Sequence, residues 1–156
     1  GQQFRWTMLN LGRVRIKGID VEAELTAVPV RHLLVTGRVQ YTYQQARDVT
    51  DPEDSYYRHQ IPYIPWHSGS AIVNIQYKDW DLNYSFIYAG ERYNQQENIK
   101  YNYMQPWYTS DLSLSYRYRM LRVMLEVNNL FSQDYDVILN YPMPKRNYGI
   151  TIDLKI

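Results

Sequence analysis

Residues 126–156, which read EVNNLFSQDYDVILNYPMPKRNYGITIDLKI, decide the fold of this chain. At the end of this stretch, apolar residues alternate one by one with small or polar residues. The apolar set is Tyr148, Ile150, Ile152, Leu154 and Ile156, and the set between them is Gly149, Thr151, Asp153 and Lys155. A period of two places the two sets on opposite faces of a β-strand, whereas a helix would mix them on every face. We therefore predict a final strand with one face toward lipid or a protein core and the other toward water.

The same alternation recurs in earlier segments of the chain. These are residues 13–27, 33–44, 71–77, 80–88, 108–118 and 121–128. Short connections near Pro29, Asp79 and Met120 alternate with long ones at about 46–63, 91–106 and 131–145. The sequence thus predicts an all-β fold, an antiparallel up-and-down meander of seven or eight strands. Bacterial single-chain barrels use even numbers of strands, so either residues 1–12 hold the end of an eighth strand or the chain is part of a larger barrel.

One irregularity interrupts the first of these segments. The alternation slips by one residue at Lys17-Gly18. A change of phase beside a glycine indicates a β-bulge. Beyond it, Asp20, Glu22 and Glu24 share one face, and such an acidic row needs water or basic neighbours.

The composition favours a surface that is dry on one side and wet on the other. The 156 residues include seventeen Tyr and four Trp but only three Phe. Tyr and Trp carry an apolar ring with a polar tip, and they concentrate at membrane interfaces and binding surfaces. The chain has no Cys, which excludes disulfides and thiolate metal sites, and its net charge of +1 gives no reason to expect nucleic acid. It opens without the basic and apolar regions of a signal peptide, so we expect Gly1 to lie inside a longer precursor.

The connections place all the long loops at one rim of the predicted sheet. Transmembrane barrels show this asymmetry, with the short turns on the periplasmic side. Aromatic residues fall at both ends of the predicted apolar faces, as expected for interfacial belts: Tyr77, Trp80 and Tyr118 at the short turns, and Tyr43, Tyr88 and Tyr108 at the long loops. The alternative is a soluble β-domain that uses Tyr for its strand propensity.

Several motifs in the last stretch carry a resemblance to a known family. They are the turn Asn129-Leu130-Phe131 followed by Tyr135, the run from Tyr141 to Arg146, and a strand that stops at the chain end. With these motifs the sequence resembles the closing hairpin of a TonB-dependent outer-membrane receptor. The family usually ends in an aromatic residue, and Ile156 departs from that pattern. Asn10-Leu11-Gly12, together with Val14, Ile16, Gly18 and Glu22, also looks like a strand entry of these receptors.

The resemblance implies a fold, a place and a function. Members have a barrel of roughly 22 strands filled by an N-terminal plug. They import siderophores, cobalamin, haem or glycans across the outer membrane of Gram-negative bacteria, with energy from the TonB complex. Residues 1–156 would be the C-terminal segment of such a barrel, without the plug. Its partners would be outer-membrane lipid, the plug and remaining strands, the TonB complex and a small-molecule or glycan ligand.

Ligand-binding residues are expected in the long loops, because a substrate outside the cell meets these loops first. The candidates are Arg47, Tyr56, Tyr57, Arg58, His59, Arg92, Tyr93, Tyr101, Tyr103, Trp107 and Arg146. Stacking aromatic rings and amides suit a sugar or an aromatic chelator, although outer loops are polar and Tyr-rich in any such barrel. Arg146 lies at the mouth of the last strand, where a basic residue can bind loop carbonyls or an acidic ligand. Residues 51–54 could hold a hard cation, but without the ordered ligand pattern of a calcium loop a solvated turn is favoured, so no metal or cofactor is expected.

Catalysis is not expected. Only His32, His59 and His67 are available as bases at neutral pH, and strand alternation sends His67 and Ser68 to opposite faces. No nucleophile elbow, zinc-protease motif or phosphate loop occurs. Two non-transport alternatives stay open: a self-contained small outer-membrane barrel with structural or adhesive loops, and a soluble β-barrel that binds a ligand.

Overall fold

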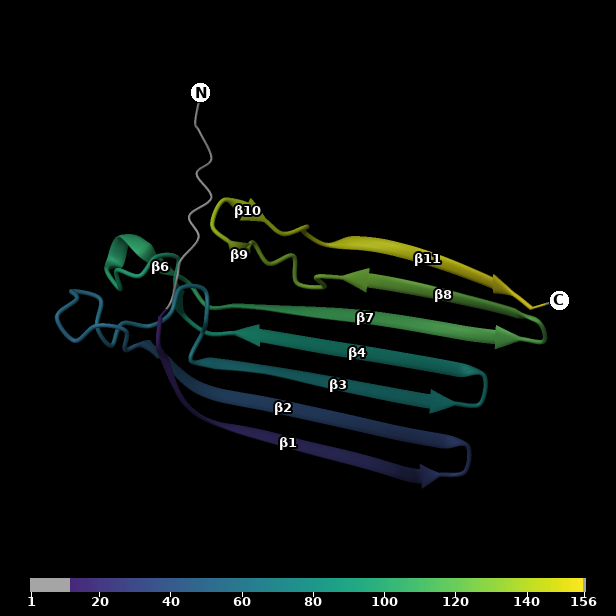
Figure 1. Cartoon of the computed structure of the whole chain (residues 1–156). Helices are drawn as coiled ribbons and strands as arrows, with labels where there is room; N and C mark the ends of the chain where they lie inside the picture. Colours follow the sequence, from purple (N-terminus) through teal and green to yellow (C-terminus); the bar gives the residue numbers. More distant parts are fainter. Residues whose placement is uncertain (1–11, 156) are drawn as a thin grey trace.

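The computed structural model describes residues 12–155, and these form one antiparallel sheet with loops at one end (Figure 1). Its seven strands follow the order β1-β2-β3-β4-β7-β8-β11. Their bounds are β1 Val14–Val30, β2 Leu33–Asp48, β3 His67–Tyr77, β4 Trp80–Ala89, β7 Trp107–Tyr118, β8 Leu121–Asn128 and β11 Asn147–Leu154. Each strand pairs antiparallel with the next long strand of the chain. The predicted all-β meander is therefore confirmed.

The register between strands sorts side chains onto two faces that differ in polarity. One row across all seven strands is apolar: Ala27, Val35, Ile75, Leu82, Leu114, Leu125 and Ile150. The adjacent row points the other way and is polar or small: Thr26, Thr36, Asn74, Asn83, Ser113, Glu126 and Gly149. We call these the apolar face and the polar face. The six aromatic residues predicted to form two belts all lie on the apolar face, and Trp80 packs on Tyr116 with ring centroids 4.6 Å apart.

The apolar face is not covered by other parts of the described chain. Ile150 is 70% exposed and Leu25 is 65% exposed. Among residues 12–155, the only buried hydrophobic residues are Ala46, Ile61 and Met104, and these do not make a core. Exposed apolar patches of this extent mark a surface that contacts protein or lipid. The sheet therefore needs an apolar environment on this face. Within the described part of the chain, no helix is long and apolar enough to cross a membrane.

The short connections are tight turns with a residue in the left-handed region. Lys78 has a φ of 52° and Arg119 a φ of 51°, at the two turns predicted near Asp79 and Met120. The first turn was predicted around Pro29, but it lies at residues 31–32, with His32 at a φ of 68°. The strand β1 continues to Val30 through a register shift between Ala27 and Val30. Pro29, which has no N–H to donate, is accommodated in that irregularity.

The bulge predicted at Lys17-Gly18 is wrong. The pairing passes through Lys17, Gly18 and Ile19 without a shift. A Cβ atom at Gly18 would collide with the carbonyl oxygen of Tyr43, so glycine is needed there for a close backbone approach. The change of phase in the sequence has another cause. Above Gly18 the apolar face becomes basic, while Val14 and Ile16 lie on the polar face.

The acidic row on the polar face of β1 does meet a basic neighbour. Arg38 on β2 lies 3.4 Å from a carboxylate oxygen of Glu22 and 3.2 Å from one of Glu24. The hydroxyl of Thr42 donates a 2.6 Å hydrogen bond to Asp20. Partners on the neighbouring strand thus offset the repulsion along this row.

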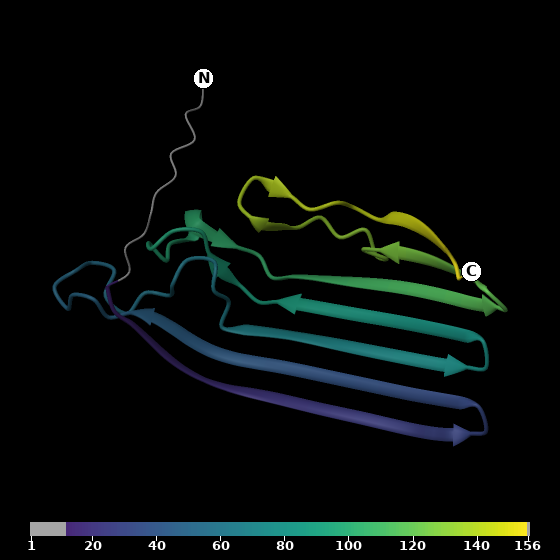
Figure 2. The ribbon, with the colours of Figure 1, turned by 45° about the vertical axis from the view of Figure 1, so that its right-hand side comes forward.

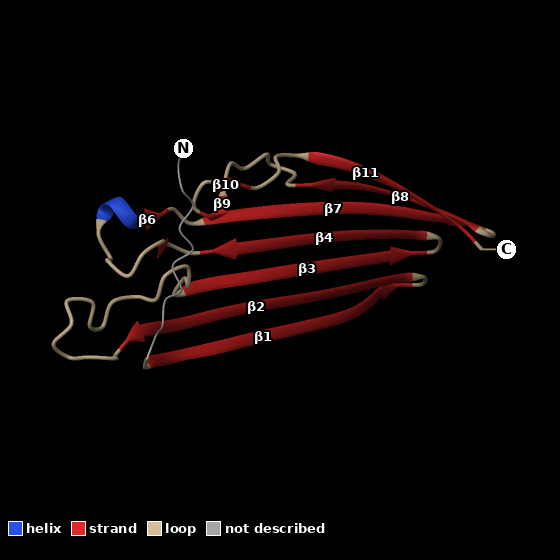
Figure 3. Cartoon of the chain, turned by 45° about the horizontal axis from the view of Figure 1, so that its top comes forward, coloured by secondary structure: helices blue, strands red, loops and turns tan. Residues whose placement is uncertain are grey.

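Three long connections gather at the rim opposite the short turns (Figures 2 and 3). We call them loop A (49–66), loop B (90–106) and loop C (129–146). Loop B contains β5 Arg92–Tyr93, the short helix η1 Lys100–Asn102 and β6 Tyr103–Met104; loop C contains β9 Asp136–Ile138 and β10 Tyr141–Pro142. This agrees with the predicted asymmetry of the rims. The possible eighth strand at residues 1–12, the strand entry at Asn10-Leu11 and the terminal Ile156 lie outside the described residues or at their border.

A charged substitution should destabilise the protein much more on the apolar face than on the polar face. Val73 lies on the apolar face near the middle of β3, and its neighbour Ile72, 49% exposed, lies on the polar face. In a lipid bilayer, Val73→Arg should destabilise the folded full-length protein by about 2–4 kcal/mol, the cost of an arginine at the bilayer midplane. Ile72→Arg is the matched control and should cost much less. The measurement is urea unfolding in lipid vesicles, and equal losses in the two variants would contradict the assignment of the faces.

Candidate functional site

Loops A and B are joined by hydrogen bonds. The backbone N–H of Gln60 donates to the Asn98 side-chain oxygen at 2.5 Å, and the Asn98 amide donates back to the Gln60 carbonyl at 3.2 Å. The Tyr63 N–H donates to the Tyr93 carbonyl at 2.8 Å. A reciprocal side-chain bond plus a backbone bond fixes the position of one loop relative to the other. The two clusters of predicted ligand-binding residues are thereby held side by side.

Two of the predicted residues in loop A lie in this junction. The His59 Nδ1–H donates to the Gln96 carbonyl at 3.0 Å, which identifies Nδ1 as the protonated nitrogen, because a carbonyl can only accept. The Tyr56 hydroxyl donates to Glu97 at 3.3 Å. The charge of Glu97 is the main cause that raises the pKa of Tyr56. Both side chains thus bind loop B in this structure.

The arginines of this cluster lie elsewhere, over aromatic rings. The Arg47 guanidinium is 5.0 Å from the centre of the Trp66 ring, and that of Arg58 is 5.3 Å from the Tyr57 ring. Cation–π contacts of this kind hold the long side chains in place. Arg47 and Arg58 line a hollow that is separate from the junction of loops A and B.

Arg92 ties loop B to loop C. The side chain is only 3% exposed; one guanidinium nitrogen donates to the Gln105 carbonyl at 2.9 Å and another donates to the Asp136 carbonyl. Burial is the main cause that lowers the pKa of Arg92, and Tyr63 and Asp136 oppose it. A buried cation is tolerated only with such partners. Arg92 therefore acts as a cross-link between the loops.

The aromatic residues of loop B differ widely in exposure. Tyr101, on the short helix, is 91% exposed. Tyr93 and Tyr103 meet edge to face with ring centroids 6.0 Å apart, and the Tyr103 hydroxyl donates to Glu91 at 3.0 Å. Tyr101 alone among these three presents its ring almost entirely to the outside.

A hollow of about 320 Å³ lies between loops B and C. It is lined by three predicted residues, Arg92, Tyr103 and Trp107, and also by Met104, Gln105, Pro106, Asp134, Tyr135, Asp136 and Leu139. The Trp107 and Tyr135 rings stack with centroids 4.6 Å apart and planes 25° apart. The volume is at the lower end of the range for small-molecule pockets. Asp134, Tyr135 and Asp136 were missed as site residues, because nothing local in the sequence shows that loop C folds back onto loop B.

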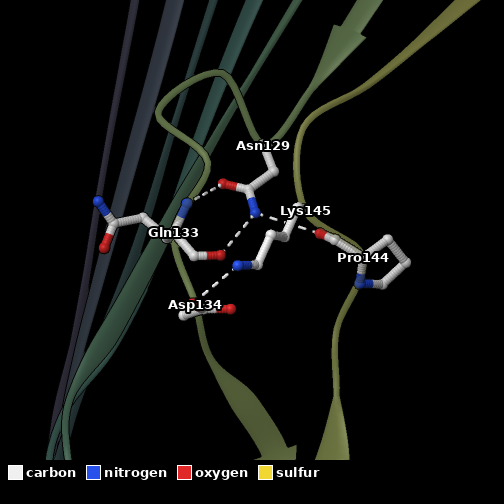
Figure 4. Close-up of polar contacts among 5 residues, drawn as sticks. All are labelled: Asn129, Gln133, Asp134, Pro144 and Lys145. Atoms are coloured by element: carbon white, nitrogen blue, oxygen red, sulfur yellow. Dashed lines mark hydrogen bonds and ion pairs between the residues drawn. The ribbon is translucent and has the colours of Figure 1, made fainter.

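Loop C is anchored by one buried asparagine (Figure 4). Asn129, 4% exposed, donates to the carbonyls of Gln133 at 2.9 Å and Pro144 at 3.2 Å, and its side-chain oxygen accepts from the Gln133 N–H at 2.9 Å. Its φ of 50° suits asparagine better than most residues. Its backbone N–H donates to Asp111 on β7 at 2.8 Å, which attaches the start of the loop to the sheet.

Two basic residues close the other end of loop C. Lys145 forms an exposed ion pair of 3.0 Å with Asp134. The Arg146 Nε donates to the Leu130 carbonyl at 2.8 Å, so Arg146 binds a loop carbonyl in this structure. A ligand role for Arg146 stays a prediction.

The acidic turn of loop A satisfies itself. Asp51 accepts from the Glu53 N–H and Asp54 from the Tyr56 N–H, both at 3.0 Å. Across residues 12–155, no cluster of three or more His, Cys, Asp or Glu side chains is placed to hold a metal ion. The two aspartates thus accept hydrogen bonds from the backbone of their own turn, as aspartates commonly do in turns.

Substitutions of Asn129 and of its neighbour Asn128 should differ sharply in their effect on loop C. Asn129→Asp keeps the acceptor oxygen but removes both amide donors and places a carboxylate beside two carbonyls, which should destabilise loop C by about 1–3 kcal/mol. Asn128→Asp is the matched control, because Asn128 donates only one exposed hydrogen bond, to Asn147. Hydrogen exchange across residues 129–146 measures the effect. Protection that stays equal in the two variants would contradict the anchor.

The loop tyrosines predict a pH dependence. Burial is the main cause that raises the pKa of both Tyr103 and Tyr135 above the ordinary 10.0; Glu91 adds to the effect on Tyr103, and Asp111 to that on Tyr135. Because the folded pKa lies above the unfolded one, the stabilisation is complete below pH 10 and is lost as the pH rises through the raised value. In an ultraviolet titration of the folded protein, Tyr103→Phe should remove a tyrosine from the late part of the curve. In Glu91→Gln, Tyr103 should titrate at a lower pH than in the unchanged protein. If Tyr103→Phe instead removed a tyrosine from the early part of the curve, the raised pKa of Tyr103 would be contradicted.

Comparisons with known proteins identify the family. Residues 1–130 match the family model described as TonB dependent receptor-like, beta-barrel. The match therefore covers most of the chain but little of the stretch 126–156 that carried the resemblance in the sequence.

Solved structures of receptors share the fold. The closed form of the ferric-catecholate import receptor Fiu from E. coli K12 superposes with a TM-score of 0.71 at 22% identity, over 90% of this chain and 21% of that one. The ferric yersiniabactin uptake receptor FyuA from Yersinia pestis gives 0.70 at 18% identity, over 91% and 22%. The ferric citrate transporter FecA gives 0.66 at 19% identity, over 77% and 21%. The chain thus spans about a fifth of the length of these receptors, and by the match over residues 1–130 it belongs to the family of TonB-dependent receptor-like β-barrels.

Proposed function

We propose that residues 1–156 are the C-terminal barrel segment of an active transporter in the outer membrane of a Gram-negative bacterium. The whole protein would carry a plug, import a ligand and draw its energy from the TonB complex. One observation carries the proposal: a sheet of this family whose apolar face is exposed on all seven strands and whose long loops are linked at one rim. A lipid-facing wall with ordered outer loops is the architecture that an importer requires.

The open sheet supports the proposal of a large barrel rather than a small closed barrel. The strands β1 and β11 lie at opposite ends of the strand order, and a self-contained barrel would pair them. Among residues 12–155 they do not pair. In a larger barrel each would pair with a further strand, which removes the exposed edges. A soluble binding module would have to cover the apolar face in another way.

We propose a ferric chelate as the first ligand to test. Fiu, FyuA and FecA are named for ferric catecholate, ferric yersiniabactin and ferric citrate, and their likeness to this chain supports that class ahead of cobalamin, haem or a glycan. The residues proposed to meet the ligand are those predicted from the sequence, apart from Arg47 and Arg58, which line a separate hollow. Of these, Tyr101 is the most accessible ring described here, at 91% exposed.

The test is uptake of radioactive iron by cells that carry or lack the full-length gene. Ferric catecholate and ferric citrate are supplied separately, with and without an uncoupler of the proton-motive force. We expect uptake of at least one complex that requires the gene and stops with the uncoupler. If uptake continued in the presence of the uncoupler, the proposal that the TonB complex supplies the energy would be contradicted. If neither complex were taken up, the proposed ligand class would be contradicted.

A loop variant tests where the ligand binds. Tyr101→Ala should weaken uptake at low ligand concentration roughly 2- to 12-fold, the loss expected for one aromatic stacking contact. Tyr118→Ala is the matched control, an exposed tyrosine (57%) at the end of β7 beside a short turn. Equal effects of the two variants would place the contact outside loop B.

A further inference from the structure

Three basic side chains on the apolar face gather just below loop A, together with one from the loop itself. Arg15, Lys17, Arg47 and Arg58 line a hollow of about 300 Å³ together with Gln45 and Val49. Arg15 and Lys17 come from β1, Arg47 from β2 and Arg58 from the loop. They are brought together by the register of the strands, because Arg15 is paired directly with Arg47 and Lys17 with Gln45.

Among the described residues, this arrangement of charges is repulsive unless an anion lies between them. Like charges directly opposite each other on neighbouring strands repel. The ion pairs found within residues 12–155 involve Arg38, Arg122 and Lys145 as the cations, and none of the four basic residues takes part. The neighbouring carboxylate of Asp48 lies on the polar face and accepts hydrogen bonds from Thr50, through its N–H at 2.8 Å and its hydroxyl at 2.6 Å.

Arg47 also has unused hydrogen-bonding capacity. Its Nε is buried and has no partner among the described residues, while one Nη donates to Gln45 at 3.4 Å. A buried donor without an acceptor is expensive and calls for an explanation. The planar guanidinium is held against Trp66, so it is already oriented for a ligand. Phosphate oxygens are strong acceptors for a guanidinium in this position.

The position of the hollow indicates where the anion comes from. On this face the pair Arg15 and Arg47 lies nearest to the loop rim. Lys17 comes next along β1, and after it Ile19 lies opposite Tyr43 on β2. The surface thus changes from cationic to apolar within about 14 Å, four residues along a strand. A lipid presents the matching sequence of chemistry, with a charged headgroup above apolar chains. A soluble anion would need only the cationic part.

We propose that Arg15, Lys17, Arg47 and Arg58 bind the phosphates of a lipid headgroup in the outer leaflet of the membrane. The acyl chains of this lipid would lie on the apolar face below Ile19. The proposal rests on the outer-membrane placement proposed above, but not on transport of any ligand. The protein can bind lipid without taking up a ligand, and it can take up a ligand without binding lipid, so the two proposals are tested separately.

The experiment is a binding titration of the full-length protein in uncharged detergent, followed by tryptophan fluorescence because Trp66 lies against Arg47. The probes are diphosphoryl lipid A, the same lipid without its phosphates, and inorganic phosphate. We expect saturable binding of diphosphoryl lipid A that weakens with salt, and at least tenfold weaker binding of the other two. Equal binding of the dephosphorylated lipid would overturn a phosphate site, and equal binding of inorganic phosphate would overturn a lipid site.

A charge-matched pair of variants locates the site. The triple variant Arg15→Gln, Lys17→Gln, Arg58→Gln should weaken binding of diphosphoryl lipid A about a hundredfold, from the loss of three cations near an anionic lipid surface. The control removes three cations at the opposite rim, with Arg31→Gln, Lys78→Gln and Arg119→Gln, and should bind as the unchanged protein does. Equal weakening in both variants, or in neither, would overturn the proposed site. The comparison of the three probes on the unchanged protein decides the question even if the triple variant does not fold.

Discussion

The structure depends on the backbone pairing of seven strands with their neighbours. In a hydrocarbon environment no water can satisfy a free N–H or carbonyl, so strands can cross it only when each backbone group has a partner on the next strand. The same pairing fixes the register, and the register decides which side chains share a face. The row from Ala27 to Ile150 is apolar on every strand because no strand is displaced by one residue relative to the next.

This constraint explains why the loops are held by polar contacts. A sheet that turns its apolar face to lipid leaves little apolar surface with which to pack its own loops, and only Ala46, Ile61 and Met104 are buried apolar residues in the described chain. Side-chain hydrogen bonds to backbone carbonyls take over that task. Arg92 links loop B to loop C, Asn129 closes loop C on itself, and the Gln60–Asn98 exchange links loop A to loop B.

The strands and two of the short turns could be predicted from the sequence because a period of two is a local signal. The same reliance on local pattern produced the mistake at Gly18. There the alternation changes because the face itself changes from apolar to basic residues, and in the sequence this looks like a change of phase. The hollow between loops B and C could not be predicted, because Arg92 reaches Asp136 across 44 residues and no periodic pattern records such a contact.

The exchange of hydrogen bonds between Gln60 and Asn98 also bears on how such receptors diversify. Asn98 supplies both an acceptor and a donor from its side chain, whereas Gln60 uses only its backbone N–H and carbonyl, so replacing Asn98 leaves two backbone groups of loop A unsatisfied. A change in loop B that removes Asn98 would therefore disturb loop A as well. Residue 98 should stay asparagine among descendants, while this exchange of hydrogen bonds permits any residue except proline, which has no N–H, at position 60.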